Sequence, residues 1–342
     1  MFVESDLNRF SLGLHCDGTK SQILDGEKTK WKYKVINVIG QGTFGVVFLS
    51  FDKNYRRVAV KKVRIDPNFK NRELEIMQKV HCQNCLALLD FYFEDDANTS
   101  EKYLFLVTDV YPYSLGKLMD EFHCLSKPID PFDIKLYAFQ IFNGLRGMHW
   151  QVIAHRDIKP DNILIDHDKG VLQLCDFGSA KCLNDDVIHI SEIGSRYYRA
   201  PELLLNNRKY GVEIDIWSAG CVIAEMSLDN YALFQGDSNE DQLIQIMKVI
   251  GPPSQEDSNS FEHEIPFPDV EQIADLSIAL PSSVDHELLD LLRRIFVYNP
   301  KQRPTCQQCI DSPYFDELFS SSAKRRNGKA LPILFRNKNT VA

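Results

Sequence analysis

Two short polar segments in the middle of the chain constrain its fold and chemistry more than any other feature. Residues 155–162 read His-Arg-Asp-Ile-Lys-Pro-Asp-Asn, and an Asp-Phe-Gly triplet begins at Asp176, fourteen residues after Asn162. Asp157 is a carboxylate that can orient an attacking hydroxyl, while Asn162 and Asp176 offer oxygen ligands suited to Mg²⁺. Because unrelated surface residues do not fall into this order by chance, the segments predict a magnesium site beside a catalytic carboxylate.

A glycine-rich segment lies between two predicted strands nearer the start of the chain. Gly40, Gly42 and Gly45 have no Cβ atoms, so the backbone there can approach a phosphate and point its N–H groups at the oxygens. A glycine-rich hairpin turn is the alternative. Because a strand follows rather than a long helix, a dinucleotide-binding fold fits poorly.

Lys61 stands at the end of an apolar strand, directly after Val58-Ala59-Val60. An ammonium in such a strand is costly unless it meets a carboxylate or a phosphate. Glu73, on the next predicted helix, is the candidate partner. The alternative is a surface lysine whose stem lies along the sheet while its charge reaches water.

The hydrophobic pattern divides the chain into a β-rich part and a helical part. Apolar and β-branched runs predict strands at residues 35–39, 46–51, 57–63, 86–93 and 103–107, with a short helix near 69–80. After Pro112 a helical face runs from Ile134 to Met148, extended pieces lie at 163–165 and 172–174, and further helices are expected at 215–226, 241–250, 286–296 and 305–312. We therefore expect an α+β chain with a small β-rich lobe, a hinge near residues 109–112 and a larger, mainly helical lobe.

The predicted domain boundaries follow from this hydrophobic pattern. A polar leader covers residues 1–32, the small lobe 33–110, the large lobe 111–318 with an irregular insert at about 252–284, and a basic tail 319–342. The tail carries six basic residues and no acidic one. We interpret it mainly as a solvated segment, with a nuclear-import or docking patch as the alternative.

The composition excludes several classes of protein. With 44% apolar and 25% charged residues among 342, the chain is globular, and no apolar run reaches the roughly 18 residues of a membrane helix. A net charge of −9 argues against nucleic acid as a partner. Nine cysteines and no secretory signal pattern favour a cytoplasmic or nuclear protein with reduced thiols and no membrane insertion.

Together these motifs resemble the signature set of the protein kinases, over about residues 33–315. The resemblance implies the bilobal kinase fold, with one regulatory helix in the small lobe, and ATP and Mg²⁺ as cofactors. It implies Asp157 as catalytic base, Lys159 on the transferred phosphate, Asn162 and Asp176 on magnesium, and Lys61 on the ATP phosphates, paired with Glu73.

The same resemblance implies a nucleotide site and one structural ion pair. Its ATP-binding residues are Gly40, Gly42 and Gly45 over the phosphates, Ile39, Val47, Ala59 and Leu164 around adenine, and the backbone of Asp109 and Tyr111 at the adenine edge. Thr108 falls at the gatekeeper position. The resemblance also implies that Arg303 pairs with Glu202.

A closer resemblance is to the glycogen synthase kinase-3 family, carried by residues 58–63, 69–74, 174–181, 195–203 and 314–318. It implies a serine/threonine kinase that favours protein substrates already phosphorylated four residues C-terminal to the target. Arg72, Arg156 and Lys181 would bind that phosphate. The alternative is that Arg156 and Lys181 only brace the activation loop. Docking of scaffold proteins at about residues 255–285 is left open.

The activation loop departs from that family at Glu192, where the family has a phosphorylatable tyrosine. A carboxylate carries about −1 where a phosphate carries about −1.5 to −2. One hypothesis is that Glu192 pairs with Arg196 or Arg199 and holds the loop open; the alternative is drift at a tolerant position. Self-phosphorylation at Tyr197 or Tyr198 is also left open.

Three other interpretations compete with this one. A proline-directed kinase of the same wider group would not need a primed substrate, and the three basic residues argue against it. A kinase-fold scaffold with little turnover would have lost the catalytic residues, which are all present. Cys82 and Cys85, with Cys306 and Cys309, have metal-ligand spacing, but the resemblance places the two pairs in different lobes, so we expect no zinc site.

Overall fold

The computed structural model describes residues 33–42, 45–65, 71–95, 101–183, 188–259, 261 and 275–336. The predicted leader over residues 1–32 and most of the insert therefore lie outside the described residues. The chain forms two compact units, one comprising Met1–Lys70 and Leu88–Pro112 and the other Asn71–Ala87 and Tyr113–Ala342.

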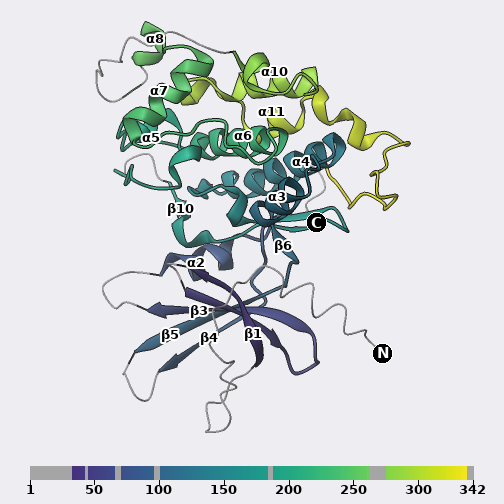
Figure 1. The fold of residues 1–342 in the computed structure, drawn as a ribbon. Helices are drawn as coiled ribbons and strands as arrows, with labels where there is room; N and C mark the ends of the chain where they lie inside the picture. The colour runs from purple at the N-terminus through teal and green to yellow at the C-terminus, as the bar shows by residue number, and fades with distance from the viewer. Residues whose placement is uncertain are drawn as a thin grey trace. The chain divides into compact units, whose positions relative to one another are not determined.

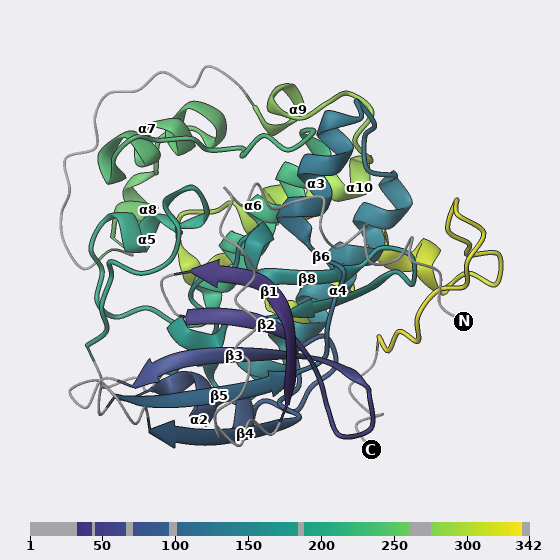
Figure 2. The same cartoon turned by 60° about the horizontal axis from the view of Figure 1, so that its bottom comes forward.

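The first unit is a five-stranded antiparallel sheet in the order β1-β2-β3-β5-β4 (Figure 2). Its strands are β1 (Lys34–Gly42), β2 (Gly45–Phe51), β3 (Arg57–Ile65), β4 (Asp90–Asp95) and β5 (Lys102–Thr108). The predicted strands are confirmed, except that residues 86–89 precede β4 rather than belong to it. A contact distant in the sequence explains this difference, because the N–H of Leu86 donates to the carbonyl of Leu174 at 2.8 Å.

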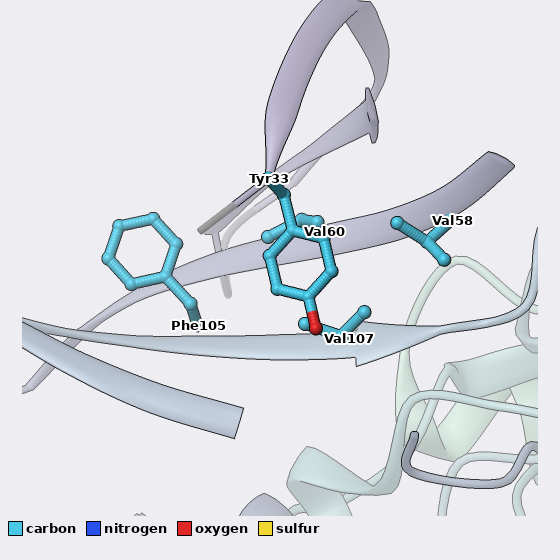
Figure 3. Close-up of a cluster of buried hydrophobic side chains, with 5 residues drawn as sticks. All are labelled: Tyr33, Val58, Val60, Phe105 and Val107. Carbon is cyan, nitrogen blue, oxygen red and sulfur yellow. The ribbon is translucent and has the colours of Figure 1, made fainter. Parts of the chain in front are cut away.

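One face of this sheet carries the core of the first unit. Val58 and Val60 on β3 and Phe105 and Val107 on β5 alternate with outward residues, and Tyr33 covers them (Figure 3). The buried side chains lie two residues apart along each strand, so the opposite face presents the residues between them. That opposite face is where the predicted nucleotide residues are found.

The second unit is mainly helical and is built around α4 (Pro131–His149), in which 14 of 19 residues are buried (Figure 1). Asp130 caps its first turn and Pro131 occupies the first helical position, so the sequence starts this helix sharply. α6 (Glu213–Ser227) and α11 (Cys306–Ile310) pack against it. The other helices are α2 (Arg72–Lys79), α3 (Leu115–Cys124), α5 (Pro201–Leu204), α7 (Asn239–Ile250), α8 (Gln255–Ser258), α9 (Leu276–Ala279) and α10 (His286–Ile295).

Short strands and 3₁₀ turns carry the polar motifs of this unit. The strands are β6 (Tyr113–Ser114), β7 (Ile153–Ala154), β8 (Ile163–Asp166), β9 (Val171–Leu174) and β10 (Lys181–Cys182). The 3₁₀ turns are η1 (Pro160–Asn162), η2 (Phe177–Ser179), η3 (Arg196–Tyr198), η4 (Pro300–Gln302) and η5 (Pro313–Phe319). β6, β8 and β9 form one small sheet, and β7 pairs with β10. None of the described helices is long and apolar enough to cross a membrane.

The predicted helices from residue 131 onward are confirmed in place and type, with bounds that differ by one to three residues at most ends. α2 begins at Arg72, and residues 69–70 of its predicted range lie outside the described part. Although α2 was predicted within the small lobe, it groups with the second unit and lies beside η2. In the insert, α8 begins with a capping box between Ser254 and Asp257.

The basic tail is not the solvated segment that its charge predicts. The side chain of Arg325 is fully buried, with Nε 2.7 Å from Asp133 Oδ1 on α4. Arg325 Nη1 donates to the carbonyl of Asp168 at 3.1 Å. Farther along, Gln83 Nε2 donates to the carbonyl of Ile333 at 2.8 Å. The segment up to residue 336 is therefore part of the second unit's packing.

Candidate active site

The turn that carries Asp157 is held by a buried carboxylate on α6. Asp215 accepts hydrogen bonds from the backbone N–H groups of His155 and Arg156, both at 2.8 Å, and His149 Nε2 lies 2.9 Å away. Burial opposes the charged form, yet the His149 contact and the Arg156 N–H hold the pKa of Asp215 below its usual value. These contacts fix Arg156 at φ +67°, a conformation that non-glycine residues rarely adopt.

Asp157 lies at the centre of a compact hydrogen-bond network. Asn162 Nδ2 donates to its Oδ2 at 2.8 Å, and Lys159 Nζ lies 3.3 Å from the same oxygen. Asp157 Oδ1 accepts from the N–H of Ser195 at 3.0 Å and from its hydroxyl at 3.2 Å. Lys159 Nζ also donates to Ser195 Oγ at 3.0 Å. The Ser195 hydroxyl thus lies between the Asp157 carboxylate and the Lys159 ammonium. A site that activates a substrate hydroxyl needs the same two groups beside it.

Sequence reasoning missed this contact of Ser195. Its only signal was its place in the 195–203 stretch, and a serine in a loop has many uses. Likewise, Asp215 was predicted only as the start of the helix at 215–226, without its role as the acceptor that shapes the Asp157 turn.

The two predicted magnesium ligands lie on neighbouring backbone segments. The N–H of Cys175, which precedes Asp176, donates to the carbonyl of Asn162 at 2.9 Å. His155 Nε2 lies 2.9 Å from the Cys175 carbonyl, and the ring of Phe177 packs 5.5 Å from the His155 ring. Asn162 uses its amide nitrogen on Asp157, which leaves its oxygen for a cation. An amide oxygen and a carboxylate are a donor set that fits Mg²⁺, which takes few protein ligands and completes its shell with phosphate and water.

In the first unit, the predicted nucleotide residues share one face of the sheet. Gly40 pairs with Val47, and Val47 pairs with Lys61. Ala59 precedes Lys61 by two residues and pairs with Thr108. Side chains of directly opposed residues point to the same face, so this row lies opposite the Tyr33 core. Ile39 and Gly42 belong to the same β1–β2 hairpin, whose tip at residues 43–44 lies outside the described part.

Gly45 shows why the hairpin needs glycine. Its φ is +134°, and a Cβ atom there would lie 2.2 Å from the carbonyl oxygen of Lys62. At the other end of the sheet, Asp109 and Tyr111 follow β5, and Arg56 forms an ion pair with Asp109. The Asp109 side chain is thereby held by the protein, while the adenine contact predicted for this segment involves its backbone.

Two predicted partnerships join residues of different units and stay predictions. Lys61 lies on β3 of the first unit, whereas Glu73 lies on α2 of the second and is buried. Asn71 caps α2 by accepting from the N–H of Glu73 at 3.0 Å, which fixes the start of that helix. Leu164, predicted to contact adenine, lies on β8 of the second unit.

The three predicted phosphate-binding cations come together within the second unit. Lys181 pairs with Ala154 across β10 and β7, which places it beside the loop of Arg156. Burial, and then the charges of Arg156 and Arg72, lower the pKa of the Lys181 ammonium. In the described part of the chain, none of the three forms an ion pair with a carboxylate; Arg156 donates instead to the Ser179 carbonyl. Cations gathered without a counter-charge indicate an anion site.

Comparison with known proteins decides the family. Residues 33–315 match the family model of the protein kinase domain. The chain is 41% identical over 299 residues to the serine/threonine-protein kinase RIM11/MSD1 of Saccharomyces cerevisiae, covering 85% of this chain and 79% of that protein. It is 38% identical to protein kinase gsk3 of Schizosaccharomyces pombe over 310 residues, covering 89% and 79%. It is also 38% identical to glycogen synthase kinase 1 of Pyricularia oryzae over 307 residues, covering 88% and 77%.

The chain is a protein kinase of the glycogen synthase kinase-3 family. It is therefore an ATP-dependent enzyme that transfers a phosphoryl group to serine or threonine of protein substrates. Protein kinases use ATP, typically with Mg²⁺, and the Asn162 and Asp176 oxygens suit that ion. The predicted fold, enzyme class and family are all confirmed.

The activation segment of this kinase does not form the predicted ion pair. Glu192 is exposed, and in the described residues its carboxylate pairs with neither Arg196 nor Arg199. Arg199 Nε donates to the carbonyl of Gly194 at 2.8 Å, and Arg196 donates to the carbonyl of Asp237. The direct ion pair is thus absent among the described residues, and a role of Glu192 in holding the loop open stays a prediction. The charge of Glu192 still acts on Arg199. Burial and the charge of Arg196 lower the pKa of Arg199, and the charge of Glu192 partly opposes this.

Other contacts define the remainder of the kinase segment. Tyr197 is exposed, whereas the Tyr198 hydroxyl donates to Glu225 at 2.8 Å and is half-buried. The predicted pair between Arg303 and Glu202 is confirmed as a buried bidentate contact with two 2.7 Å hydrogen bonds. Such a pair ties the end of the segment to η4.

The cysteine pairs of the kinase are placed differently from the expectation. Cys82 and Cys85 belong to the second unit, as do Cys306 and Cys309, so the two pairs do not lie in different lobes. Cys85 contacts the Gly144 carbonyl on α4, and Cys306 Sγ lies 3.3 Å from His149 Nδ1. Across the described ranges, no group of three or more His, Cys, Asp or Glu side chains is arranged so that it could hold a metal ion.

Proposed function

We propose that this kinase favours protein substrates that already carry a phosphate four residues C-terminal to the target serine or threonine. The observation that carries the proposal is the cluster of Arg72, Arg156 and Lys181 without a carboxylate partner. A phosphate with a charge of about −1.5 to −2 would remove the mutual repulsion of these cations. Guanidinium and ammonium groups are the side chains best suited to hold it.

The chain's own residues support a positioning mechanism for the transfer. Asp157 would accept a hydrogen bond from the substrate hydroxyl and take its proton as the hydroxyl oxygen bonds to the γ-phosphorus and the bond from that phosphorus to the ADP oxygen breaks. Lys159, 3.3 Å from the same carboxylate, would meet the transferred phosphate. Asn162 and Asp176 would hold Mg²⁺, which, when bound, neutralises charge on the phosphate oxygens. Lys61 would hold the ATP phosphates.

Two finer expectations accompany this proposal. Docking of scaffold proteins at about residues 255–285 stays a prediction, because residues 262–274 lie outside the described part and Phe261 is buried. Residence in the cytoplasm or nucleus likewise rests on the sequence alone.

The competing interpretation is that the basic residues only brace the activation segment. One contact favours a partial bracing role, because Arg156 Nε donates to the carbonyl of Ser179 at 2.6 Å. However, Arg156 Nη1 turns to the Tyr210 hydroxyl, and Arg72 is exposed at the start of α2. An exposed arginine beside two other cations, Arg156 and Lys181, is repelled by them. A bound anion would explain why the three cations lie together.

The test compares two peptides with serines spaced by four, one with its C-terminal serine phosphorylated in advance. The wild-type kinase should prefer the primed peptide. Arg72→Ala removes one charge-assisted hydrogen bond, worth about 1.5–3 kcal/mol, so kcat/KM on the primed peptide should fall roughly 10- to 150-fold. Loss on the unprimed peptide should be smaller.

Two variants serve as controls in this experiment. Lys79→Ala changes another exposed cation of α2, paired with Glu75 at 2.8 Å, and should leave the preference intact. Asp157→Asn should be inactive on both peptides. Equal rates on the two peptides with wild type would discard the priming role and favour the unprimed alternative. No transfer to either peptide, with ATP still bound, would favour the scaffold.

A further inference from the structure

A buried histidine adjoins the three cations of the proposed phosphate pocket. His189 is 3% exposed, and its Nδ1 lies 2.9 Å from Lys181 Nζ. An ammonium can only donate, so this nitrogen must accept, and the imidazole is neutral with its proton on Nε2. The backbone N–H of His189 donates to the Arg208 carbonyl at 2.8 Å, which fixes the residue in place.

Among the residues that the structure describes, the groups that face this imidazole carry positive charge or none. Lys181 comes from β10, and Arg156 comes from the Asp157 turn. The ring of Tyr210 packs 5.2 Å away, and its hydroxyl accepts from Arg156 Nη1 and donates to the Ile190 carbonyl. The positive charge of Arg72 lowers the pKa of Lys181, which contacts the imidazole. Burial, and then Lys181 and Arg156, lower the pKa of His189, so the histidine is neutral while no anion is bound.

We propose that His189 is a fourth member of this pocket and takes up a proton when a phosphate-like dianion binds there. The inference rests on the proposed phosphate pocket and adds the residue that makes its affinity depend on pH. A dianion cancels the field of the neighbouring cations, which removes the charges that keep the imidazole neutral. Protonation then frees Lys181 Nζ from its acceptor and adds a positive charge behind the anion.

The sign follows from linkage between the two binding events. If the anion raises the histidine's proton affinity, protons raise the anion affinity by the same factor. Binding should therefore tighten as pH falls through the range between the two pKa values of His189. An increase of one pKa unit corresponds to an affinity gain of up to about tenfold.

Inorganic sulfate is the probe, because its charge does not change in this range whereas phosphate itself titrates. Sulfate is titrated into the full chain at constant ionic strength, at about pH 8 and about pH 6, and the dissociation constant is followed by NMR. The wild type should bind roughly three- to tenfold more tightly at the lower pH. His189→Gln, which keeps an acceptor for Lys181 but cannot titrate, should lose this dependence. His286→Gln, at an exposed site on α10, should keep it.

The second measurement needs no variant at His189. The assigned imidazole C–H signal of His189 in the wild type gives its pKa with and without saturating sulfate, and sulfate should raise it. An unchanged value overturns the inference, as does an identical pH dependence in wild type and His189→Gln. If Arg72→Ala binds sulfate as well as wild type, the pocket itself is refuted. Loss of binding in Arg72→Ala without any pH effect leaves the pocket and removes only the role of His189.

Discussion

Arg325 connects the C-terminal segment to the longest helix of the second unit. Its side chain is fully buried, with Nε 2.7 Å from Asp133 Oδ1 and Nη2 3.2 Å from the Tyr137 hydroxyl. Replacing Arg325 with leucine leaves the Asp133 carboxylate buried without its counter-charge. Breaking a buried pair in this way costs about 3–5 kcal/mol of unfolding free energy. At roughly 2–4 °C per kcal/mol for a unit of this size, Tm should fall by about 6–20 °C.

The next residue supplies a matched control. Arg326 also pairs with a carboxylate, Asp130, at 2.6 Å, but its side chain is 83% exposed. The Asp130 side chain is only 14% exposed, so the pair is half exposed. Its loss should cost more than the about 0–1 kcal/mol of a fully exposed pair and less than the about 3–5 kcal/mol of the buried one, so Arg326→Ala should lower Tm less than Arg325→Leu. Thermal unfolding followed by circular dichroism at one pH measures both variants. The neighbouring arginines have the same charge, so the difference in their burial is the main cause of the different effects expected.

A double variant tests the cause of the loss. Arg325→Leu combined with Asp133→Leu removes both charges, so no buried ion remains unpaired, and most of the stability should return. Equal effects of Arg325→Leu and Arg326→Ala would refute the docking of the tail. A double variant as unstable as the single one would show that packing and the Asp168 and Tyr137 hydrogen bonds, rather than the ion pair, hold the segment.

Two further predictions concern the activation segment. Ser195→Ala removes the hydroxyl that bridges Asp157 and Lys159, so kcat should fall at least about tenfold in initial-rate assays; an unchanged kcat would count against the network. Burial raises the pKa of Glu225 to about 7, although Tyr198 donates to it. The folded state thus binds a proton that the unfolded state has lost, and stability decreases as pH rises from about 4.5 to about 7. Glu225→Gln should remove this slope and be more stable near pH 8 by about 3 kcal/mol in urea unfolding, and an unchanged slope would refute the assignment.

The parts of the site that could be predicted are those in which neighbouring residues carry the chemistry. Asp157, Lys159 and Asn162 lie within six residues, and a single turn brings their side chains onto one another. The β-rich unit was predictable because its strands alternate between a core face and the opposite face. Neither inference needs a long-range contact. The contact of Ser195 with Asp157, 38 residues away, does need one, and its only signal in the sequence was the place of Ser195 in the 195–203 stretch.

The burial and the partners of charged residues could not be predicted from the sequence. Arg325, Arg326 and Lys329 look alike in the sequence and each pairs with a carboxylate far away along the chain, yet only Arg325 is buried. The pairing of Arg303 with Glu202 was expected only through the family resemblance, since 101 residues separate them. A cation can be buried only where a distant partner or a polar acceptor meets it. The burial of a basic residue thus depends on contacts that only the folded chain makes. Arg72, Arg156 and Lys181 meet no carboxylate among the described residues, and for that reason we propose an external anion as their partner.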